Sequence, residues 1–323
     1  MPDPQPAAPP VASAPVKSGY EAVLAQFAHE YMRDRRSARR WKLFFRLVWL
    51  TLIVGLLWVV LAPRYHMNPP SSPHTALVEV RGEIAEDTDA SAELIVSALK
   101  DAFAEPNAQA IVMRFNSPGG SPVQAGIVYD EINRLRAQYH KKVYAVCEEI
   151  CASGAYYMAA AADEIYVDKA SVVGSIGVLM DGFGFTGVME KVGVERRLLT
   201  AGANKGMLDP YSPLPPKQRA YAQAMLDQIH QQFIDVVREG RGKRLKETPD
   251  TFSGLFWNGE EAVKMGLADD FGNLDFVARE VVKAEDVIDY TPRDNVAERL
   301  AKRFGAAFGE SAVKSLRTLP SIR

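Results

Sequence analysis

The stretch from residue 108 to residue 149 reads AQAIVMRFNSPGGSPVQAGIVYDEINRLRAQYHKKVYAVCEE, and it decides the fold class. Its opening run is apolar and rich in β-branched residues, which predicts a buried strand over residues 108–116. Ser121 as a cap and Pro122 at the first helical position predict a helix over residues 122–139. A second apolar run predicts a strand over residues 141–149. Strand, helix and strand at this spacing are typical of an α/β domain with a mainly parallel sheet.

The same alternation continues on both sides of this stretch. Apolar runs and helical periodicity predict further strands over residues 75–84, 164–168, 171–180 and 194–200, and further helices over residues 90–105, 153–162 and 215–240. In such sheets ligands bind outside the carboxyl ends of the strands. Two strands end in loops of unusual composition, which begin at Asn116 and at Cys147.

Composition narrows the class of protein. The 323 residues contain 38 Lys and Arg against 40 Asp and Glu, a net charge of −2, so nothing suggests a nucleic-acid partner. Two cysteines, Cys147 and Cys151, exclude a disulfide framework and a Cys-rich zinc module. The five histidines lack metal-ligand spacing. We therefore expect no cofactor and no metal.

Residues 43–62 read LFFRLVWLTLIVGLLWVVLA, with Arg46 as the single charge. This length matches a hydrocarbon core of about 30 Å and predicts one transmembrane helix. Basic residues gather before the span, between residues 33 and 42, which predicts that residues 1–42 are a cytoplasmic tail, and the Pro- and Ala-rich composition of the first 18 residues predicts that this tail is partly disordered. The rest of the chain would lie outside the cytoplasm. A cleaved signal peptide and a buried core helix are the alternatives.

Two further segments flank the α/β region. Residues 63–74 are rich in Pro and Ser and are expected to be a linker, in which His66 and His74 would be solvated. Residues 286–323 are expected to form a C-terminal helical tail, with a mildly basic amphipathic helix at residues 295–323.

No histidine lies in a plausible active-site loop, so hydrolysis would need another base. Ser153 is the candidate nucleophile, because it stands among small residues at the start of a predicted helix, whose first N–H groups point toward anything bound there. The alternative is that Ser153 only caps this helix.

Three other residues carry candidate chemistry. Gly119 and Gly120 follow a buried strand and permit a backbone that could offer N–H groups to an oxyanion, although a plain turn would use them equally well. Lys205 stands among small and apolar residues, where a lowered pKa would let it act as a base. The alternative for Lys205 is an exposed loop lysine.

Five motifs in series resemble the signal peptide peptidase A family, peptidase family S49, in its short single-domain form. They are NSPGGSP (116–122), ASGAYYMAAAADEIYV (152–167), SVVGSIGV (171–178), AGANKGMLDPYSPL (201–214) and WNGEEAVKMGLADDFG (257–272). The resemblance covers residues 75–285. It implies a crotonase/ClpP-like protease domain there, anchored in the membrane by the N-terminal helix.

The resemblance also implies roles for individual residues. Ser153 matches the nucleophile, Lys205 the general base, and Ser175 the hydroxyl that orients the lysine. Gly119 or Gly120, together with Gly154, matches the oxyanion hole. In short members the Ser and Lys of one site come from adjacent subunits, which implies a homo-oligomer such as an octameric ring.

The function implied is endopeptidase cleavage of remnant signal peptides at the bacterial inner membrane, with the protease domain in the periplasm. The expected partners are these peptides and the lipid bilayer, with no nucleic acid. A membrane protease of general quality control and a non-catalytic ClpP-like scaffold are the alternatives. The chain departs from the family at Ala155, where Gly is usual, and after Gly254, where Arg is usual. Cys147 and Cys151 are unusual so near the nucleophile and are expected to be free buried thiols, with a disulfide between them as the alternative if the domain is periplasmic.

Overall fold

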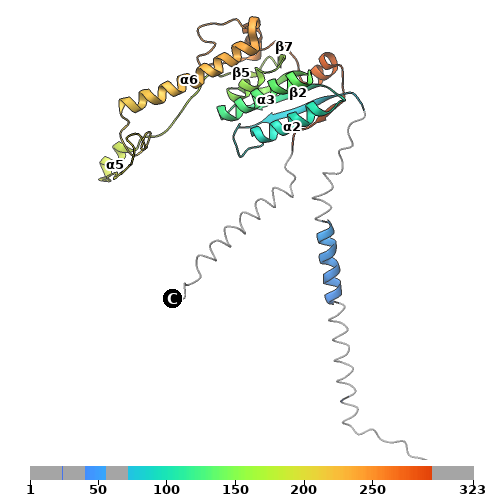
Figure 1. Cartoon of the computed structure of the whole chain (residues 1–323), viewed down its shortest axis with the longest axis horizontal. Coiled ribbons are helices and arrows are strands. Elements are labelled where there is room, and N and C mark those ends of the chain that lie inside the picture. The colour runs from blue at the N-terminus through green and yellow to red at the C-terminus, as the bar shows by residue number, and fades with distance from the viewer. Residues whose placement is uncertain (1–23, 25–40, 56–71, 293–323) are drawn as a thin grey trace, which may run out of the picture. The chain divides into compact units, whose positions relative to one another are not determined.

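The computed structural model describes residue 24, residues 41–55 and residues 72–292 (Figure 1). The chain divides into two units, residues 1–68 with 300–323 and residues 69–299. In the first unit, residues 41–55 are helical and exposed. No helix within the described ranges is both long enough and apolar enough to cross a membrane. Residues 56–62 of the predicted span over residues 43–62 lie outside those ranges, and so do most residues of the predicted tail and linker.

The second unit is built on an eight-stranded sheet with the order β6-β5-β3-β2-β1-β8, in which β4 pairs with β3 and β7 pairs with β4. Every pairing is parallel except that of β5 with β6. The strands are β1 (His74–Arg81), β2 (Ala108–Ser117), β3 (Lys142–Ala152), β4 (Glu164–Val167), β5 (Val172–Gly174), β6 (Phe256–Asn258), β7 (Asp270–Phe271) and β8 (Val287–Asp289). This mixed α/β architecture agrees with the predicted class.

Helices cover both faces of the sheet, so the side chains of β2, which alternate from one face to the other, enter two different cores. Ile111, Met113 and Phe115 join the larger core with α2, α3 and α4, whereas Val112 joins a smaller core with Val277. The helical segments are α2 (Ala92–Ala104), α3 (Pro122–Tyr139), α4 (Gly154–Ala159), α5 (Thr186–Val192), α6 (Pro216–Arg241), α7 (Gly259–Met265), α8 (Leu274–Phe276), the short η1 (Gly242–Arg244) and the π-helical η2 (Val277–Val282).

Strand β3 changes partners halfway along its length. Residues 144–147 pair with β4, and residues 150–152 pair with β5. The register against β2 shifts between these halves, so that Cys147 lies opposite Phe115 and Cys151 lies opposite Ser117. The second half of β3 therefore leads away from β4 and carries the chain to Ser153.

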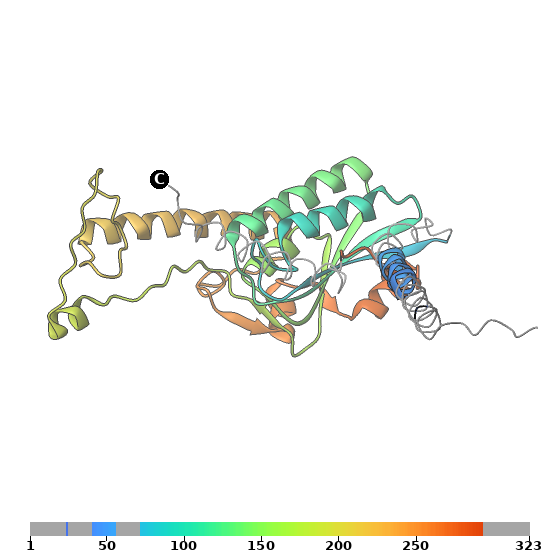
Figure 2. The same cartoon turned by 90° about the horizontal axis from the view of Figure 1, so that it is seen from below.

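Segment 179–221, which we call the arm, extends beyond the sheet and includes α5 and the first part of α6 (Figure 2). Two predictions are wrong in and beside this region. The strand expected over residues 171–180 is only the three residues of β5, and residues 194–200 form no strand. A strand needs a neighbouring strand for its backbone hydrogen bonds, and residues 194–200 are exposed without one among the residues that the structure describes.

Two strands of the sheet extend into segments that the sequence predicted to be a linker and a helical tail. His74, expected to be solvated, is fully buried as the first residue of β1. Its Nδ1–H donates to the Ser72 carbonyl at 3.0 Å, and the Tyr290 hydroxyl donates to its Nε2 at 2.9 Å. Strand β8 pairs with β1 within the segment expected to be a helical tail. Residues 293–323 of that segment, including the expected amphipathic helix, lie outside the described ranges.

Candidate active site

Ser153 lies at the junction of β3 and α4 in an unusual backbone conformation. Its φ is +52° and its ψ is −124°, whereas a residue that caps a helix normally has an extended backbone with negative φ. Its N–H donates to the Gly174 carbonyl at 2.8 Å, and its carbonyl accepts the Tyr157 N–H at 2.9 Å. These two bonds fix the residue between β5 and the first turn of α4.

The Ser153 hydroxyl makes no capping hydrogen bond to its helix. The hypothesis that this serine is present only as a cap is therefore wrong. A side chain other than Gly at positive φ costs about 1–3 kcal/mol, and such residues cluster at active sites and ligand-binding sites. This conformation makes Ser153 a candidate functional residue.

The loop of Gly119 and Gly120 lies directly beside Ser153. Their φ values are +98° and +148°. A Cβ on Gly119 would lie 2.6 Å from the Ser153 Cβ and 2.7 Å from the Gly154 nitrogen. A side chain at residue 119 would therefore occupy the space next to the serine, and only Gly fits.

The N–H groups of this loop have different partners. Gly119 donates to the Ser117 hydroxyl at 3.1 Å. The bridge between this loop and Ile84 uses the Gly119 carbonyl and the Ser121 N–H, so the Gly120 N–H takes no part in it. Gly154 is the first residue of α4, where an N–H has no acceptor within the helix. The N–H groups of Gly120 and Gly154 are thus the ones suited to a ligand.

Ser175 follows β5 in a tight turn and is also at positive φ, +53°. Its N–H donates to the Leu255 carbonyl at 2.8 Å, and the Gly177 N–H donates back to the Ser175 carbonyl at 3.0 Å. Ser175 is one residue from Gly174, which accepts the Ser153 N–H. The two serines are thus held together through the backbone.

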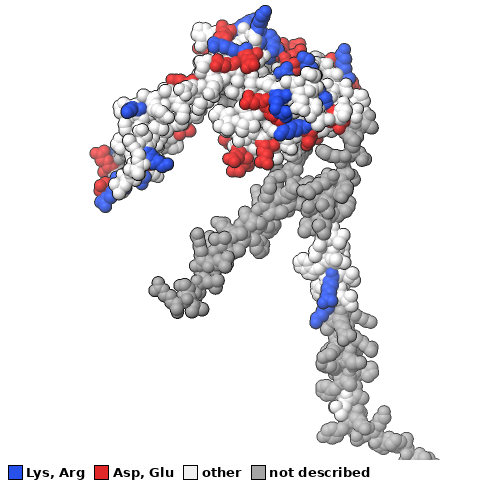
Figure 3. All heavy atoms as spheres, viewed as in Figure 1, with Lys and Arg blue, Asp and Glu red and all other residues white. Residues whose placement is uncertain are grey.

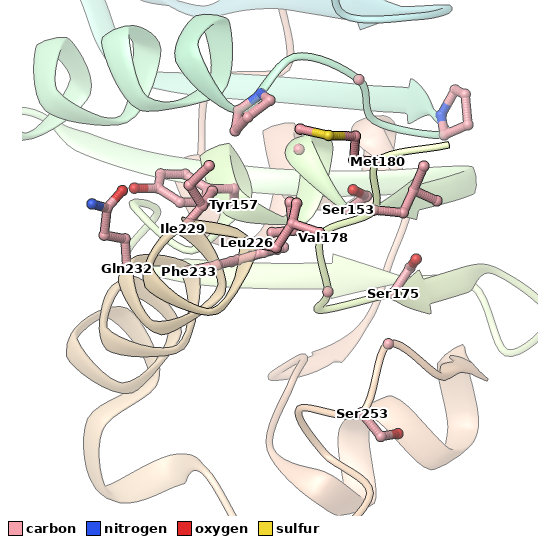
Figure 4. Close-up of a pocket in the computed structure, with 17 residues that line it drawn as sticks. Ser153, Tyr157, Ser175, Val178, Met180, Leu226, Ile229, Gln232, Phe233 and Ser253 are labelled. Carbon is pink, nitrogen blue, oxygen red and sulfur yellow. The ribbon is translucent and has the colours of Figure 1, made fainter. Parts of the chain in front are cut away.

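A cavity of about 640 Å³ joins these groups (Figure 4). Ser153 and Ser175 lie at one end of it, and Tyr157, Phe233 and Gln232 lie at the other. The centroids of the Tyr157 and Phe233 rings are 5.0 Å apart. Gly120 and Gly154 also line the cavity, and most of its remaining lining is apolar, from Val178, Leu179, Met180, Leu226 and Ile229. The space suits an apolar chain bound beside a hydroxyl.

Lys205 does not line this cavity within its own chain. It is exposed on the arm, in a turn where its N–H donates to the Gly202 carbonyl at 3.1 Å. The structure therefore brings together Ser153, Ser175, Gly120 and Gly154, with Gly119 packed behind them, and leaves Lys205 apart.

No histidine of the described ranges lines the cavity either. His140 caps the end of α3, and His230 donates from Nε2 to the Ile176 carbonyl at 3.1 Å. Within these ranges no group of three or more His, Cys, Asp or Glu residues could hold a metal ion.

The wall supplied by α6 was not foreseen from the sequence. Leu226, Ile229 and Phe233 follow a helical stripe that predicts a core face, yet all three line the cavity. The stripe gives no signal of its own, because apolar side chains repeat in the same way toward a core and toward an apolar cavity. Tyr157 likewise lines the cavity, and burial, with nearby Asp130 acting in the same direction, raises its pKa.

Of the unusual residues noted in the sequence, Ala155, Cys147 and Cys151 lie behind the site, whereas Gly254, after which Arg is usual, lines the cavity. Ala155 is fully buried in the larger core and does not line the cavity. Cys147 and Cys151 are free and buried. Burial raises the pKa of the Cys151 thiol well above its usual value, and its contact with Cys147 acts in the same direction. A thiol in this state is inert at neutral pH.

Comparisons with known proteins give the family. The model of "Peptidase family S49" matches residues 136–288, which include Ser153, Ser175 and Lys205. The chain is 31% identical over 197 residues to "Putative protease slr0021" of Synechocystis, covering 61% of this chain and 69% of that protein. It is 26% identical over 181 residues to "Putative signal peptide peptidase SppA" of Enterococcus faecium, covering 56% and 52% of the two chains.

A third relative is similar over a smaller part of its own length. The chain is 46% identical over 176 residues to "Na(+)/H(+) antiporter NhaA" of Brucella melitensis, covering 54% of this chain but 24% of that protein. The family-model match and the similarity to the Synechocystis protease agree with the five motifs and with the mixed α/β sheet. The chain belongs to peptidase family S49.

Proposed function

We propose that this chain is a serine endopeptidase in which Ser153 is the nucleophile. The observation that carries the proposal is the strained, uncapped Ser153 at the end of an apolar cavity, beside two backbone N–H groups suited to a ligand. A serine hydroxyl attacks a peptide carbonyl only when a base removes its proton and donors stabilise the oxyanion. Both requirements point to particular residues.

The oxyanion donors in this proposal are the N–H groups of Gly120 and Gly154. The Ser117 hydroxyl engages the Gly119 N–H, so Gly119 serves by leaving room beside Ser153. In the first step Ser153 Oγ bonds to the carbonyl carbon and its proton passes to the base. The base then returns this proton to the leaving amine, and water releases the acyl group from Ser153 in the second half of the reaction.

The base in this proposal is a neutral Lys205 of a neighbouring copy, oriented by the Ser175 hydroxyl. Two observations support a neighbouring copy as its source: Lys205 lies outside its own cavity, and the arm that carries it exposes many apolar side chains. Exposed apolar surface of this extent is typical of an interface. The chain would then assemble as a homo-oligomer, such as an octameric ring, with a crotonase/ClpP-like fold.

The proposed substrates are extended apolar peptides, in particular signal peptides left after cleavage of preproteins. The apolar lining of the cavity and the name of the Enterococcus relative support this substrate class. In this proposal residues 43–62 anchor the chain in the inner membrane and residues 1–42 are cytoplasmic. Residues 63–74 would then link the anchor to a periplasmic protease domain.

The test combines labelling with cleavage. Purified full-length protein is treated with a fluorophosphonate and with an apolar peptide substrate, alongside Ser153→Ala and Lys205→Ala. We expect the label on Ser153, and we expect either variant to lower turnover at least about a thousandfold. Lys217→Ala is the matched control, because Lys217 is an exposed lysine of the same arm. If Ser153 stays unlabelled in the intact oligomer, the alternative function of a non-catalytic ClpP-like scaffold is favoured.

Mixing the two inactive variants tests the source of the lysine. If Ser and Lys of one site come from different copies, random assembly of equal amounts restores about a quarter of the sites, half times half. If both come from one copy, the mixture stays inactive.

A further inference from the structure

One hydrogen bond joins α6 to the turn that carries Ser175. His230, in the middle of α6, donates from Nε2 to the Ile176 carbonyl at 3.1 Å, across 54 residues of sequence. Its ring is partly buried and does not line the cavity. His230 therefore faces the chain beside the proposed active site rather than the bound peptide.

The Ser175 turn is held firmly on its other side. Ser175 donates to the Leu255 carbonyl, and Gly177 packs so closely on Gly254 that a Cβ on Gly177 would lie 3.0 Å from the Gly254 Cα. The turn's own bond, from the Gly177 N–H to the Ser175 carbonyl, closes around Ile176. On the side of α6, the carbonyl at the apex of this turn is fixed by His230.

The protonation of His230 follows from its partner. A carbonyl only accepts hydrogen bonds, so Nε2 carries the hydrogen and Nδ1 is the other nitrogen of the ring. The bond would persist if the ring became charged, because Nε2 remains a donor. A donor at this distance from the main chain is the feature that matters, and a glutamine amide at the same position can supply it.

We propose that His230 is a positioning residue that holds the Ser175 turn at the reacting serine. Helix α6 supplies Leu226, Ile229 and Phe233 to the cavity wall, so the same bond couples that wall to the turn. The Ser175 backbone is tied to Ser153 through Gly174, and a shift of the turn would move the hydroxyl that orients the base. This inference rests on the proposed function of Ser153, Ser175 and Lys205.

The experiment compares His230→Leu, which keeps the bulk and removes the donor, with His230→Gln, which keeps a donor. Gln228→Leu is the matched control, an exposed position on the same helix. Peptide cleavage gives kcat and KM, and amide hydrogen exchange followed by mass spectrometry reports on residues 172–181. We expect His230→Leu to lower kcat about tenfold and to raise exchange in this segment, since one hydrogen bond is worth roughly that factor. KM should stay within about twofold, because the bond acts on the chemical step.

His230→Gln and Gln228→Leu should match the wild type in both measurements. Wild-type kcat in His230→Leu, with or without faster exchange, would overturn the proposal, because the bond would then be structural only. Equal losses in His230→Gln and His230→Leu would also overturn it, since the donor would not be the cause. Failure of the proposed function has a different signature: the wild type itself cleaves nothing, while the exchange data still decide whether His230 holds the turn.

Discussion

At the scale of single residues, the backbone of Ser153 gives the clearest sign of function. Positive φ at a serine is unfavourable, and no capping bond of the hydroxyl offsets the cost. Sequence reasoning could place Ser153 at a helix start but could not choose between cap and nucleophile, because both need a small polar residue there. The backbone angle and the missing capping bond argue against the cap and support the proposed nucleophile.

This strain predicts a difference between two inactive variants. Ser153→Gly and Ser153→Ala both remove the hydroxyl, but only Gly tolerates φ near +52° without a Cβ penalty. We expect Ser153→Gly to be more stable by about 1 kcal/mol, which corresponds to a Tm about 2–4 °C higher. Thermal unfolding followed by circular dichroism measures the difference in Tm between the two variants. An equal or higher Tm for Ser153→Ala would mean that the site is not strained.

The glycine beside Ser153 predicts a second pair of variants. Gly119→Ala places a Cβ 2.8 Å from the Ala152 carbonyl oxygen as well as against Ser153, so we expect cleavage to fall about a hundredfold or more. Gly126→Ala is the control, because Gly126 lies within α3 with nothing within 4 Å of its Cβ position. That change should leave cleavage intact and stabilise the helix by about 1 kcal/mol. An active Gly119→Ala enzyme would show that this contact is not needed.

At the scale of elements, helices with local signals were predicted well and strands at the edge of the sheet were not. Helix α3 runs over Pro122–Tyr139 as expected, because the Ser121 hydroxyl accepts the Gln124 N–H and Pro122 fixes the first turn. These signals lie within a few residues of the helix. Residues 194–200 have strand composition but no partner strand in the described part of the chain, and no local sequence pattern reports a missing partner. The contribution of α6 to the cavity wall could not be predicted either, because an apolar helical stripe does not show whether it faces a core or a cavity.

The end of α6 carries a buried ion pair with a predictable pH dependence. Arg241 is 1% exposed, and it donates to the Gly266 carbonyl at 2.8 Å and to Asp269 at 2.9 Å. Burial alone would raise the pKa of Asp269, but the Arg241 hydrogen bond and charge outweigh it and hold the pKa below its usual value. A carboxylate of this kind stabilises the fold above its unfolded pKa of about 4, and that stability is lost as the pH falls through the lower pKa of the folded state.

We therefore expect Asp269→Asn to lower stability by about 3 kcal/mol at neutral pH, because it leaves Arg241 buried without its counter-charge. The difference from the wild type should shrink as the pH falls below about 4, where the wild-type carboxylate is also being protonated. Thermal unfolding of both proteins between about pH 3 and pH 7 measures it. Glu260→Gln removes an exposed ion pair with Lys264 and should change little. A difference that stays constant with pH would exclude the Asp269 charge as the cause.

At the scale of the whole molecule, the arm exposes many large apolar side chains. Figure 3 shows it largely uncharged between charged ends, and α5 has no buried residue. Leu199 is 96% exposed, Leu179 81% and Phe183 80%. Such a segment gains stability by packing against another surface, and Lys205, the proposed base, lies outside the cavity of its own chain. Both observations support the proposed interface between copies of the chain.

The last prediction follows from that coincidence. Leu199→Glu places a charge in the proposed interface, where burying it without a partner costs several kcal/mol, and each 1.4 kcal/mol lowers association about tenfold. We expect the mass of the detergent-solubilised protein, measured by light scattering, to fall to the 35.6 kDa of one chain. Peptide cleavage should be lost with it, because Lys205 no longer reaches a neighbouring Ser153. Gln138→Glu adds the same charge to the exposed surface of α3 and should leave both unchanged. A Leu199→Glu protein that keeps the wild-type mass would place the interface elsewhere, and one that becomes monomeric yet still cleaves would show that each chain holds a complete site.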